Sequence, residues 1–563
     1  MAYRVSRAGR RMLNQFLRRG KETSLILPSY KPPLQVVLDI LISGMLLAVP
    51  FIFLFLDYRI GAVVIGLVLG LWLIREFFSQ DDHALVRIYG PVGRLRYLFE
   101  REFRDKYLQY FNETNTDGRP IPRIVRNYIY QKAHNLKSLA SFGTELDPFD
   151  RNTTTAVRIL HRNFPGTLGN TSYGFEIGAR REGVRPFKVI NTLNISAMSY
   201  GSINYRSAEA MSLGAKDVAY LNTGEGGYGP HGIAGGDNVF QIGTGKFGVG
   251  RVESGPDGSE IRVLDDQSLQ SLVREHENIR MIQIKISQGG KPALGGHLPG
   301  GKVTKEIAAV RKVPEGKSVI SPPQHVELQA ASPRESISKL LDFIDRVRAL
   351  TELPVSIKFC VGHPSEVDLL VEAMQATGRG PDHIQLDGAD GGTGAGENLF
   401  INYVGYGTAI ETLAYLDARL KAASIRDEVH LSASGRIFTP AHAALAFACG
   451  ADSIDTARGA LLALGCIQSL KCHTNECPTG ITTNSTWRTH GLVVPEKASR
   501  IHHYLRGFHE DMLRLAHITG HSDPRDIQTD DLRYITAEGK YAEHFHHDPD
   551  GIHMPPHDFA GYS

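Results

Sequence analysis

The stretch VSIKFCVGHPSEVDLLVEAMQATGRGPDHIQLDGADGGTGAG, residues 355–396, decides the fold. It contains two short apolar runs, at 355–360 and 383–387, and between them an amphipathic pattern that begins at Pro364. Short apolar runs bounded by glycine and proline are typical of buried strands, and an amphipathic pattern of this kind is typical of a helix. The stretch therefore predicts a strand, a helix and a second strand parallel to the first.

The same alternation continues on both sides, from residue 189 to residue 457. Six more runs have the pattern of strands: VINTLNIS (189–196), VAYLNT (218–223), IRMIQIKIS (279–287), SVISP (318–322), HLSAS (430–434) and SIDTA (453–457). Eight short strands with helices between them predict an α/β protein built on a (β/α)8 TIM barrel. A doubly wound open sheet is the alternative, because it uses the same alternation.

Glycine-rich loops follow most of these strands, and in a barrel such loops gather at the carboxyl ends of the strands, where ligands bind. Glycine lets the backbone approach a flat ring or a phosphate closely. The loops after the last three strands predict a phosphate site, for which a plain tight turn is the alternative at each glycine. The residues of this predicted site are Gly391, Gly392, Gly435, Arg436, Arg458 and Gly459.

Three of the five cysteines lie close together in GCIQSLKCHTNECPTG, residues 465–480. The thiols of Cys466, Cys472 and Cys477 can surround one soft metal centre, and three ligands favour an iron–sulfur cluster because structural zinc takes four. Three unrelated thiols are the alternative. Cys360 and Cys449 lie in apolar runs and are expected to be core thiols, so the cysteines do not predict a disulfide framework.

Composition describes a mostly ordinary globular protein, with 22% charged and 42% apolar residues among 563. The net charge of +2 argues against a general nucleic-acid binder. The C-terminal residues 521–563 are rich in histidine, which is consistent with a disordered tail or with a metal site.

The N-terminal region differs from the rest. Residues 1–33 carry eight Lys or Arg and one acid, and two apolar runs follow at 34–56 and 60–74. Because a spanning helix needs about 20 apolar residues, we expect a transmembrane helical hairpin at 34–78. A basic start stays in the cytoplasm, so the bulk of the chain is expected on the cytoplasmic side of the cytoplasmic membrane. A buried hairpin in a soluble core is the alternative, and residues 3–19 could also lie on an anionic membrane surface.

Several motifs together resemble the synthase domain of glutamate synthase over residues 180–520. They are NTGEGG, KISQGGKPALGGHLPGGKVTKEIAAVR, VISPPQH, DGADGGTGAG and the three-cysteine run followed by PTGI. The resemblance implies an FMN-binding barrel beside a [3Fe–4S] cluster that passes electrons to the flavin. It also implies an oxidoreductase that reductively aminates 2-oxoglutarate to glutamate through 2-iminoglutarate. Residues 79–179 are then a helical and loop extension packed on the barrel.

The resemblance also implies roles for single residues. Ala197, Met198 and Ser199 match the loop under the flavin ring, and Lys285 and Gln288 match positions that contact FMN. Glu225 matches an acid near the ring that is linked to ammonia entry, and Lys291 matches a lysine between flavin and substrate. Arg311 matches the arginine that pairs with the oxoacid carboxylate, for which a solvated helix face is the alternative.

The chain departs from the family in three ways that bear on its partners. His297 stands where the family usually has a substrate-contacting glutamine, so the substrate could be another small oxoacid or amine. No glutaminase domain is recognised, so we expect ammonia from solution or from a separate glutaminase subunit. No strand followed by a GxGxxG loop is found for a nicotinamide cofactor, so electrons are expected from a ferredoxin, a reductase subunit or a quinol. An electron-transfer subunit without a substrate of its own is the rival from another class.

Overall fold

Eight parallel strands close into a barrel in the order β4-β5-β6-β9-β12-β13-β14-β15. The computed structural model describes residues 59–99 except 82, 115–145 except 117, 157–165, 172–229, 235–291 except 256, 257 and 259, 294–535, and the pairs 541–542, 547–548 and 551–552. The barrel strands are β4 Leu193–Ile195, β5 Leu221–Asn222, β6 Asn238–Ile242, β9 Ile279–Lys285, β12 Val355–Phe359, β13 His383–Asp387, β14 His430–Ser434 and β15 Ser453–Thr456. Every neighbouring pair is parallel, which confirms the TIM barrel and excludes the open sheet.

One of the eight predicted barrel strands is wrong. Residues 318–322 contain only the two-residue strand β11 (Val319–Ile320), which pairs antiparallel with β10 (His297–Leu298) outside the barrel. Ile320 is 72% exposed there, and Pro322 ends the run because proline cannot donate to a strand ladder. The position in the barrel belongs instead to β6, whose sequence NVFQI places Asn238 and Gln241 among apolar residues.

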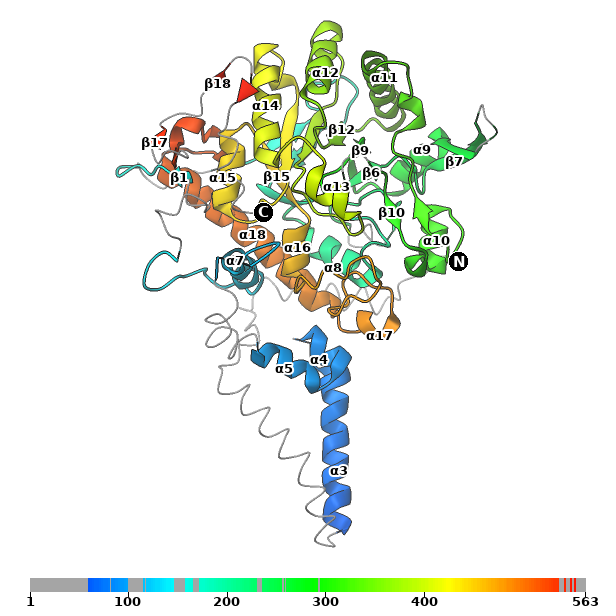
Figure 1. Ribbon diagram of the computed structural model, residues 1–563, viewed down its shortest axis with the longest axis vertical. Coiled ribbons are helices and arrows are strands. Elements are labelled where there is room, and N and C mark those ends of the chain that lie inside the picture. Colours follow the sequence, from blue (N-terminus) through cyan, green and yellow to red (C-terminus); the bar gives the residue numbers. More distant parts are fainter. Residues whose placement is uncertain are drawn as a thin grey trace. The chain divides into compact units, whose positions relative to one another are not determined.

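Helices form the outer layer around the strands (Figure 1). Those that accompany the barrel are α8 Tyr205–Ala215, α9 Asp266–Glu275, α11 Pro333–Thr351, α12 Pro364–Thr377, α14 Ala409–Ala422, α15 Pro440–Ala448, α16 Arg458–Ala463 and α18 Val494–Thr519. Their starts follow from local sequence: Ser332 and Thr439 cap α11 and α15, each followed by a proline at the first helical position. Gly378, with φ +63, ends α12 in the left-handed conformation that glycine adopts without strain.

Shorter elements complete the barrel-containing unit, which comprises residues 81–88 and 113–563. The helices are α7 Arg123–Ala133, α10 Lys305–Arg311, α13 Asn398–Tyr403, α17 Thr486–Thr489 and α4 Ala84–Tyr89, of which the last residue is assigned to the second unit. The strands are β1 Val157–Ile159, β2 Phe175–Ile177, β3 Phe187–Val189, β7 Gly250–Ser254, β8 Glu260–Leu264, β16 Leu532–Ile535, β17 Tyr541–Ala542, β18 His547–Asp548 and β19 Gly551–Ile552. Because β16 pairs with β1, residues 532–535 belong to a sheet of this unit. The histidines 544, 546, 553 and 557 lie outside the described residues.

The interior of the barrel is polar and cross-linked. Gln283 on β9 accepts hydrogen bonds from Asn222 (2.7 Å) and Gln241 (2.6 Å), and it donates to Gln385 (3.0 Å) and Ser356 (3.1 Å). These five residues come from five strands and are all buried. Satisfied buried polar groups fix geometry, so the network sets the relative positions of the strands.

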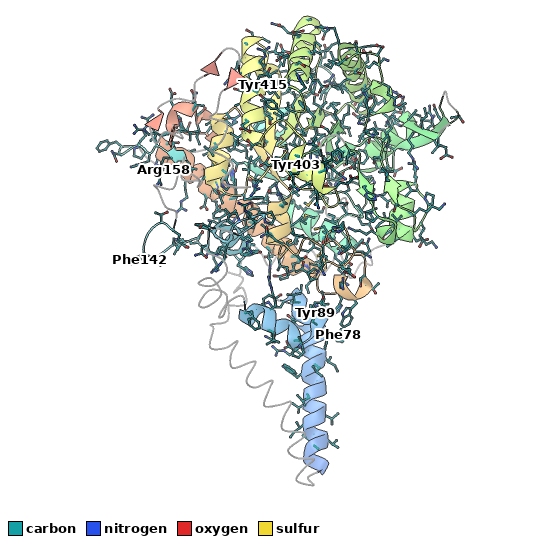
Figure 2. The ribbon with its side chains drawn as sticks, in the orientation of Figure 1. Phe78, Tyr89, Phe142, Arg158, Tyr403 and Tyr415 are labelled. Carbon is teal, nitrogen blue, oxygen red and sulfur yellow. The ribbon has the colours of Figure 1, made fainter. Side chains whose placement is uncertain are left out.

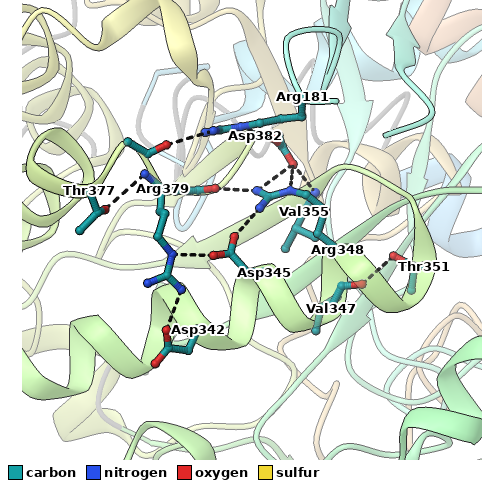
Figure 3. Close-up of polar contacts among 12 residues, drawn as sticks. Arg181, Asp342, Asp345, Val347, Arg348, Thr351, Val355, Thr377, Arg379 and Asp382 are labelled. Atoms are coloured by element: carbon teal, nitrogen blue, oxygen red, sulfur yellow. Dashed lines mark hydrogen bonds and ion pairs between the residues drawn. The ribbon is translucent and has the colours of Figure 1, made fainter. Parts of the chain in front are cut away.

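A charged network fixes the amino ends of the strands (Figure 3). Asp382, directly before β13, accepts hydrogen bonds from the backbone of Val355 (2.7 Å), from Arg348 (3.3 Å) and from Arg181 (3.2 Å). The helix α11 supplies Arg348, which also pairs with Asp345 at 2.6 Å. In TIM barrels this end of the molecule serves stability, whereas the carboxyl ends carry the chemistry.

The second unit comprises residues 1–80 and 89–112. Its described elements are α3 Arg59–Ile74, a π-helical turn Arg75–Ser79 and α5 Val92–Leu98. In the described part of the chain, one helix, Gly61–Ser79, is long and apolar enough to span a membrane. The other predicted half of the hairpin, residues 34–56, lies outside the described residues.

Within this second unit, Glu76 is fully buried and accepts two hydrogen bonds of 2.8 Å from Arg94 of α5. The aromatic side chain of Phe78, close to Glu76 in sequence, is 54% exposed (Figure 2).

Candidate active site

A polar cavity lies at the carboxyl ends of the barrel strands. It encloses about 600 Å³, part of which is open to solvent. Of the residues predicted to bind a cofactor, those that line it are Ala197, Ser199, Lys285, Gln288, Gly391, Gly392, Gly435, Arg436 and Arg458. The structure therefore brings together residues that are up to 261 positions apart in the sequence, between Ala197 and Arg458.

Two arginines mark one end of the cavity. Arg458 donates to the carbonyl oxygen of Asp390 at 2.9 Å, and Arg436 donates to that of Pro120 at 2.6 Å. Burial lowers the pKa of Arg458 to about 10, and Asp390 acts in the opposite direction, so the guanidinium is charged at neutral pH. Two guanidinium groups beside Gly391 and Gly392 suit a phosphate, because both the charge and the backbone amides favour an anion.

Glycines let the loops of this end touch through their backbones. A Cβ atom on Gly289 would lie 2.0 Å from the carbonyl oxygen of Gly388, and one on Gly392 would lie 2.8 Å from Cδ of Arg458.

Gly459 has a different position from the other glycines predicted for the phosphate site. It does not line the cavity: its N–H donates to Thr456 (3.2 Å), and its Cα faces the hydroxyl of Tyr504.

A buried ion pair lies beside the cavity. Nζ of Lys285, at the end of β9, is 2.6 Å from Oε1 of Glu225 and 2.5 Å from Oε1 of Gln288. Gly243 and Gly296 leave the space for the Glu225 carboxylate, since a Cβ atom on either would lie 2.4 Å from one of its oxygens. Burial alone would raise the pKa of Glu225, but Lys285, with smaller contributions from Arg311 and Lys291, lowers it below its usual value.

Lys291 is 4% exposed and donates to the carbonyl oxygen of Ala395 at 2.9 Å. Burial, together with the charge of Lys285, lowers the pKa of Lys291 to about 8, against the opposing effect of Glu225. A lysine in this condition can gain or lose a proton near neutral pH. The charges of these three side chains, Lys285, Glu225 and Lys291, therefore influence one another.

Arg311 and His297 lie in different environments. Arg311 ends α10 and donates from Nε (3.2 Å) and Nη2 (2.7 Å) to the carbonyl oxygen of Tyr200, and its guanidinium lies 5.1 Å from the ring centre of Phe247. It is 3% exposed, so the alternative of a solvated helix face is wrong. His297 is exposed at the start of β10, directly after Gly296, which borders Glu225.

Sequence reasoning missed an ion pair in the cavity wall. Lys358 on β12 lies 3.1 Å from Asp387 on β13, and both line the cavity. Asp387 also accepts a hydrogen bond from the backbone of Gly289 at 3.2 Å. The available signal was a charged residue in each of two buried strands, since such residues are seldom buried without a partner. Met198, which was predicted for the site, is buried next to Ala197 but does not line the cavity.

The three cysteines lie in the loop that follows α16. Cys477 is buried, Cys466 and Cys472 are half-buried, and the three thiols interact electrostatically with one another. The backbone N–H of Gln468 points at Sγ of Cys466 (3.5 Å), and Sγ of Cys477 lies 3.4 Å from the hydroxyl of Thr479. Such polar neighbours suit thiolate ligands. Among the described residues, however, no three His, Cys, Asp or Glu side chains are arranged as a metal site.

Comparisons with known proteins place these features in a family. The model of the conserved region in glutamate synthase matches residues 157–522. The glutamate synthase large subunit-like protein YerD of Bacillus subtilis is 31% identical over 522 residues, which cover 86% of this chain and 95% of that protein. The archaeal glutamate synthase [NADPH] of Archaeoglobus fulgidus is 33% identical over 324 residues, 56% of each chain.

Solved structures resemble the chain less closely. A mandelate oxidase superposes with a TM-score of 0.40 at 15% identity, covering 73% of this chain and 97% of its own, and this likeness adds nothing to the argument. The family match spans the barrel, the cavity loops and the three cysteines. The chain therefore belongs to the glutamate synthase family.

Proposed function

We propose that the chain is a glutamate-synthase-type oxidoreductase, acting on CH–NH2 donors, that reductively aminates 2-oxoglutarate or a similar small oxoacid. The observation that carries the proposal is the cavity itself, which joins an end with two arginines to the buried Lys285–Glu225 pair. The first feature suits a phosphate, and the second suits a redox ring with a polar substrate beside it. The names of the relatives support the same class of reaction.

FMN fits the donor groups of this cavity. Arg436, Arg458 and the glycine loops would hold its phosphate, and the loop of Ala197 and Ser199 would lie along its ring. When bound, FMN would supply hydride transfer to the substrate. Lys285 contributes a buried positive charge on the cavity wall, which would stabilise negative charge on a reduced ring.

The substrate side of the site depends on Lys291, Arg311 and His297. Lys291 can hold a proton near neutral pH, as general acid–base chemistry at a carbonyl or imine carbon requires. Arg311 is a cation within the electrostatic reach of Glu225 and would attract a carboxylate. The exposed His297 motivates the second candidate, a flavin oxidoreductase that acts on a different oxoacid or amine.

We further propose that Cys466, Cys472 and Cys477 hold a [3Fe–4S] cluster, which would supply single electrons. The thiols share one loop and are bordered by N–H and hydroxyl groups, which is the support for this assignment. The expected partners are an electron donor (a ferredoxin, a reductase subunit or a quinol) and a separate glutaminase subunit. We also propose that the apolar helix Gly61–Ser79 is part of a tether to the cytoplasmic membrane, and a second span at residues 34–56 would keep the barrel on the cytoplasmic side.

A direct assay tests the function. The purified full-length chain is incubated with dithionite, 2-oxoglutarate and ammonium, and glutamate is measured together with bound flavin and iron. Glutamate formation supports the leading proposal. A protein that contains flavin and iron but forms no glutamate contradicts it, and turnover of other oxoacids then selects the second candidate. If no oxoacid reacts, an electron-transfer subunit is the better description.

The cluster assignment has its own test. Replacing Cys472 with serine should remove the iron and the visible absorbance of the cluster, while flavin binding persists. Cys449→Ser is the matched control, because Cys449 is a buried thiol at the C-cap of α15 and lies outside the three-cysteine loop. Unchanged iron in Cys472→Ser would refute the ligand assignment. Adding a quinol to membranes and recording flavin reduction tests the electron source.

A further inference from the structure

The turn before α10 is fastened to the cysteine loop. This turn, Gly300–Lys302, is a short 3-10 helix. The side-chain amide of Asn475 donates to the carbonyl oxygen of Gly301 at 3.1 Å, and that of Asn484 donates to the carbonyl oxygen of Lys302 at 2.7 Å. Asn475 lies between Cys472 and Cys477, and Asn484 follows Cys477 in the same loop. The two asparagine side chains therefore hold the backbone of Lys302 against the cysteine loop.

The ammonium of Lys302 joins two functional loops. It donates to the carbonyl oxygen of Ser202 at 2.7 Å and to that of Cys472 at 3.3 Å. Ser202 closes the loop that begins with Ala197 and Ser199 in the cavity wall. One buried side chain thus connects the wall of the cavity to the backbone of a predicted cluster ligand.

Lys302 is a buried lysine, and the acidic groups that act on it among the described residues are the thiols of Cys472 and Cys477. It is 3% exposed, and within the part of the chain that the structure describes no carboxylate pairs with it. A buried charge is costly unless a counter-charge accompanies it. Cysteines bound to iron are deprotonated, so a filled cluster site would provide that counter-charge.

We propose that Lys302 is a positioning residue that balances the negative charge of the Cys472–Cys477 end of the cluster site and raises its reduction potential. The inference rests on the cluster assignment made above. When this site takes up one electron from a one-electron donor, it gains one negative charge, no covalent bond forms or breaks, and Lys302 keeps its proton. A fixed positive charge nearby favours the more negative state, so it makes reduction easier.

A redox titration of the full-length protein tests the proposal. The wild type, Lys302→Met and Lys305→Met are titrated with dithionite while the cluster is followed by electron paramagnetic resonance. Methionine keeps the length of the side chain and removes the charge. Lys305, three residues further on, is exposed and serves as the matched control. We expect Lys302→Met to lower the equilibrium constant of reduction at least tenfold, a negative shift of about 59 mV for a one-electron couple, and Lys305→Met to change nothing.

The possible outcomes distinguish a failure of the proposed role of Lys302 from a failure of the cluster assignment. A wild type without iron contradicts the cluster itself. A wild type with a cluster whose potential is unchanged in Lys302→Met overturns the inference alone. If Lys302→Met loses iron or fails to fold, Lys302→Arg decides: a retained cluster supports the need for a positive charge, and a lost cluster overturns it in favour of a purely steric role.

Discussion

Among single side chains, the Lys285–Glu225 pair gives a prediction about stability and pH. Both side chains are 9% exposed, and their contact of 2.6 Å holds the pKa of Glu225 below its ordinary value. A carboxyl with a depressed pKa stabilises the fold above its unfolded-state pKa of about 4.3, and this contribution disappears as the pH falls through the lower folded value. We expect Glu225→Gln to cost about 3–5 kcal/mol at neutral pH, because Lys285 is left buried without a counter-charge.

Thermal melting of both proteins from pH 7 downwards measures this effect. The difference between wild type and Glu225→Gln should be largest at neutral pH and should narrow below about pH 4.3. Melting curves that differ equally at all pH values would show that the pair does not contribute through its charge.

Lys291 gives a second prediction, about the rate of the proposed reaction. Its ammonium, with a pKa of about 8, carries a proton below that pH and loses it above. If the protonated form is the active one, the turnover rate falls as the pH rises through about 8, and Lys291→Met loses roughly 10²–10⁴-fold in rate. The arginine in Lys291→Arg remains charged at all accessible pH values. Any activity that this variant retains should therefore not fall as the pH rises. A wild-type rate that does not fall above pH 8 would remove Lys291 from this role.

Among loops and strands, the close approach of Gly289 and Gly388 gives a prediction about flavin binding. A methyl group at position 289 would overlap the carbonyl oxygen of Gly388 at 2.0 Å, so Gly289→Ala must push apart the loops after β9 and β13. We expect the variant to fold but to lose most of its bound flavin, measured as the ratio of flavin to protein. Gly301→Ala is the control, because a Cβ atom there meets nothing within 4 Å. Equal flavin content in the two variants would contradict the account.

The charged network at the opposite ends of the strands predicts a change in stability without a change in chemistry. Asp382→Ala leaves Arg348, Arg181 and the backbone N–H of Val355 without their shared acceptor (Figure 3). Breaking a buried pair of this kind costs about 3–5 kcal/mol. Urea unfolding should therefore shift to a lower midpoint, while flavin content at low urea stays that of the wild type. A variant that loses flavin before it unfolds would place the network in the functional site.

These elements also show what the sequence alone can predict. The strands β13 and β14 begin and end where their apolar runs predict, because short hydrophobic segments between glycine-rich loops have few other stable arrangements. The strand β6 was missed: Asn238 and Gln241 interrupt its apolar pattern, and Gln241 belongs to the polar network centred on Gln283. Gln385 interrupts β13 in the same way, so a polar interruption alone does not decide whether a strand is recognised. A polar partner in a distant strand cannot be recognised from the local pattern.

Contacts between distant parts of the sequence also explain which residues of the candidate site were predicted and which were not. The glycine loops and Lys285 were predictable, since their spacing carries the family resemblance. The pair Lys358–Asp387 could not be predicted, because each residue has its charged partner on the adjacent strand and the sequence does not show which strands are adjacent. The contacts of Arg311 and Lys302 with backbone carbonyl oxygens were beyond sequence reasoning altogether, because any residue type can supply such an acceptor.

At the scale of the whole chain, the helix α3 predicts association with a membrane. Its apolar side chains are exposed along its length, with Val63 63%, Leu67 64% and Leu71 67% exposed. A helix with this much exposed apolar surface is stable only against lipid or another apolar surface, and the 19-residue helix Gly61–Ser79, formed by α3 with the π-helical turn, is long enough for a bilayer. We expect the full chain to remain with membranes through high salt and alkaline carbonate and to be released by detergent.

A substitution makes this test specific to the helix. A charged residue at the centre of a spanning helix costs about 2.5–3.5 kcal/mol, so Leu67→Arg combined with Leu71→Arg should move a large share of the protein to the soluble fraction. Ile320→Arg is the control, because Ile320 is an equally exposed apolar residue (72%) on the barrel unit. If the wild type is extracted by alkaline carbonate alone, α3 does not span the membrane, and the quinol becomes the least favoured of the electron donors.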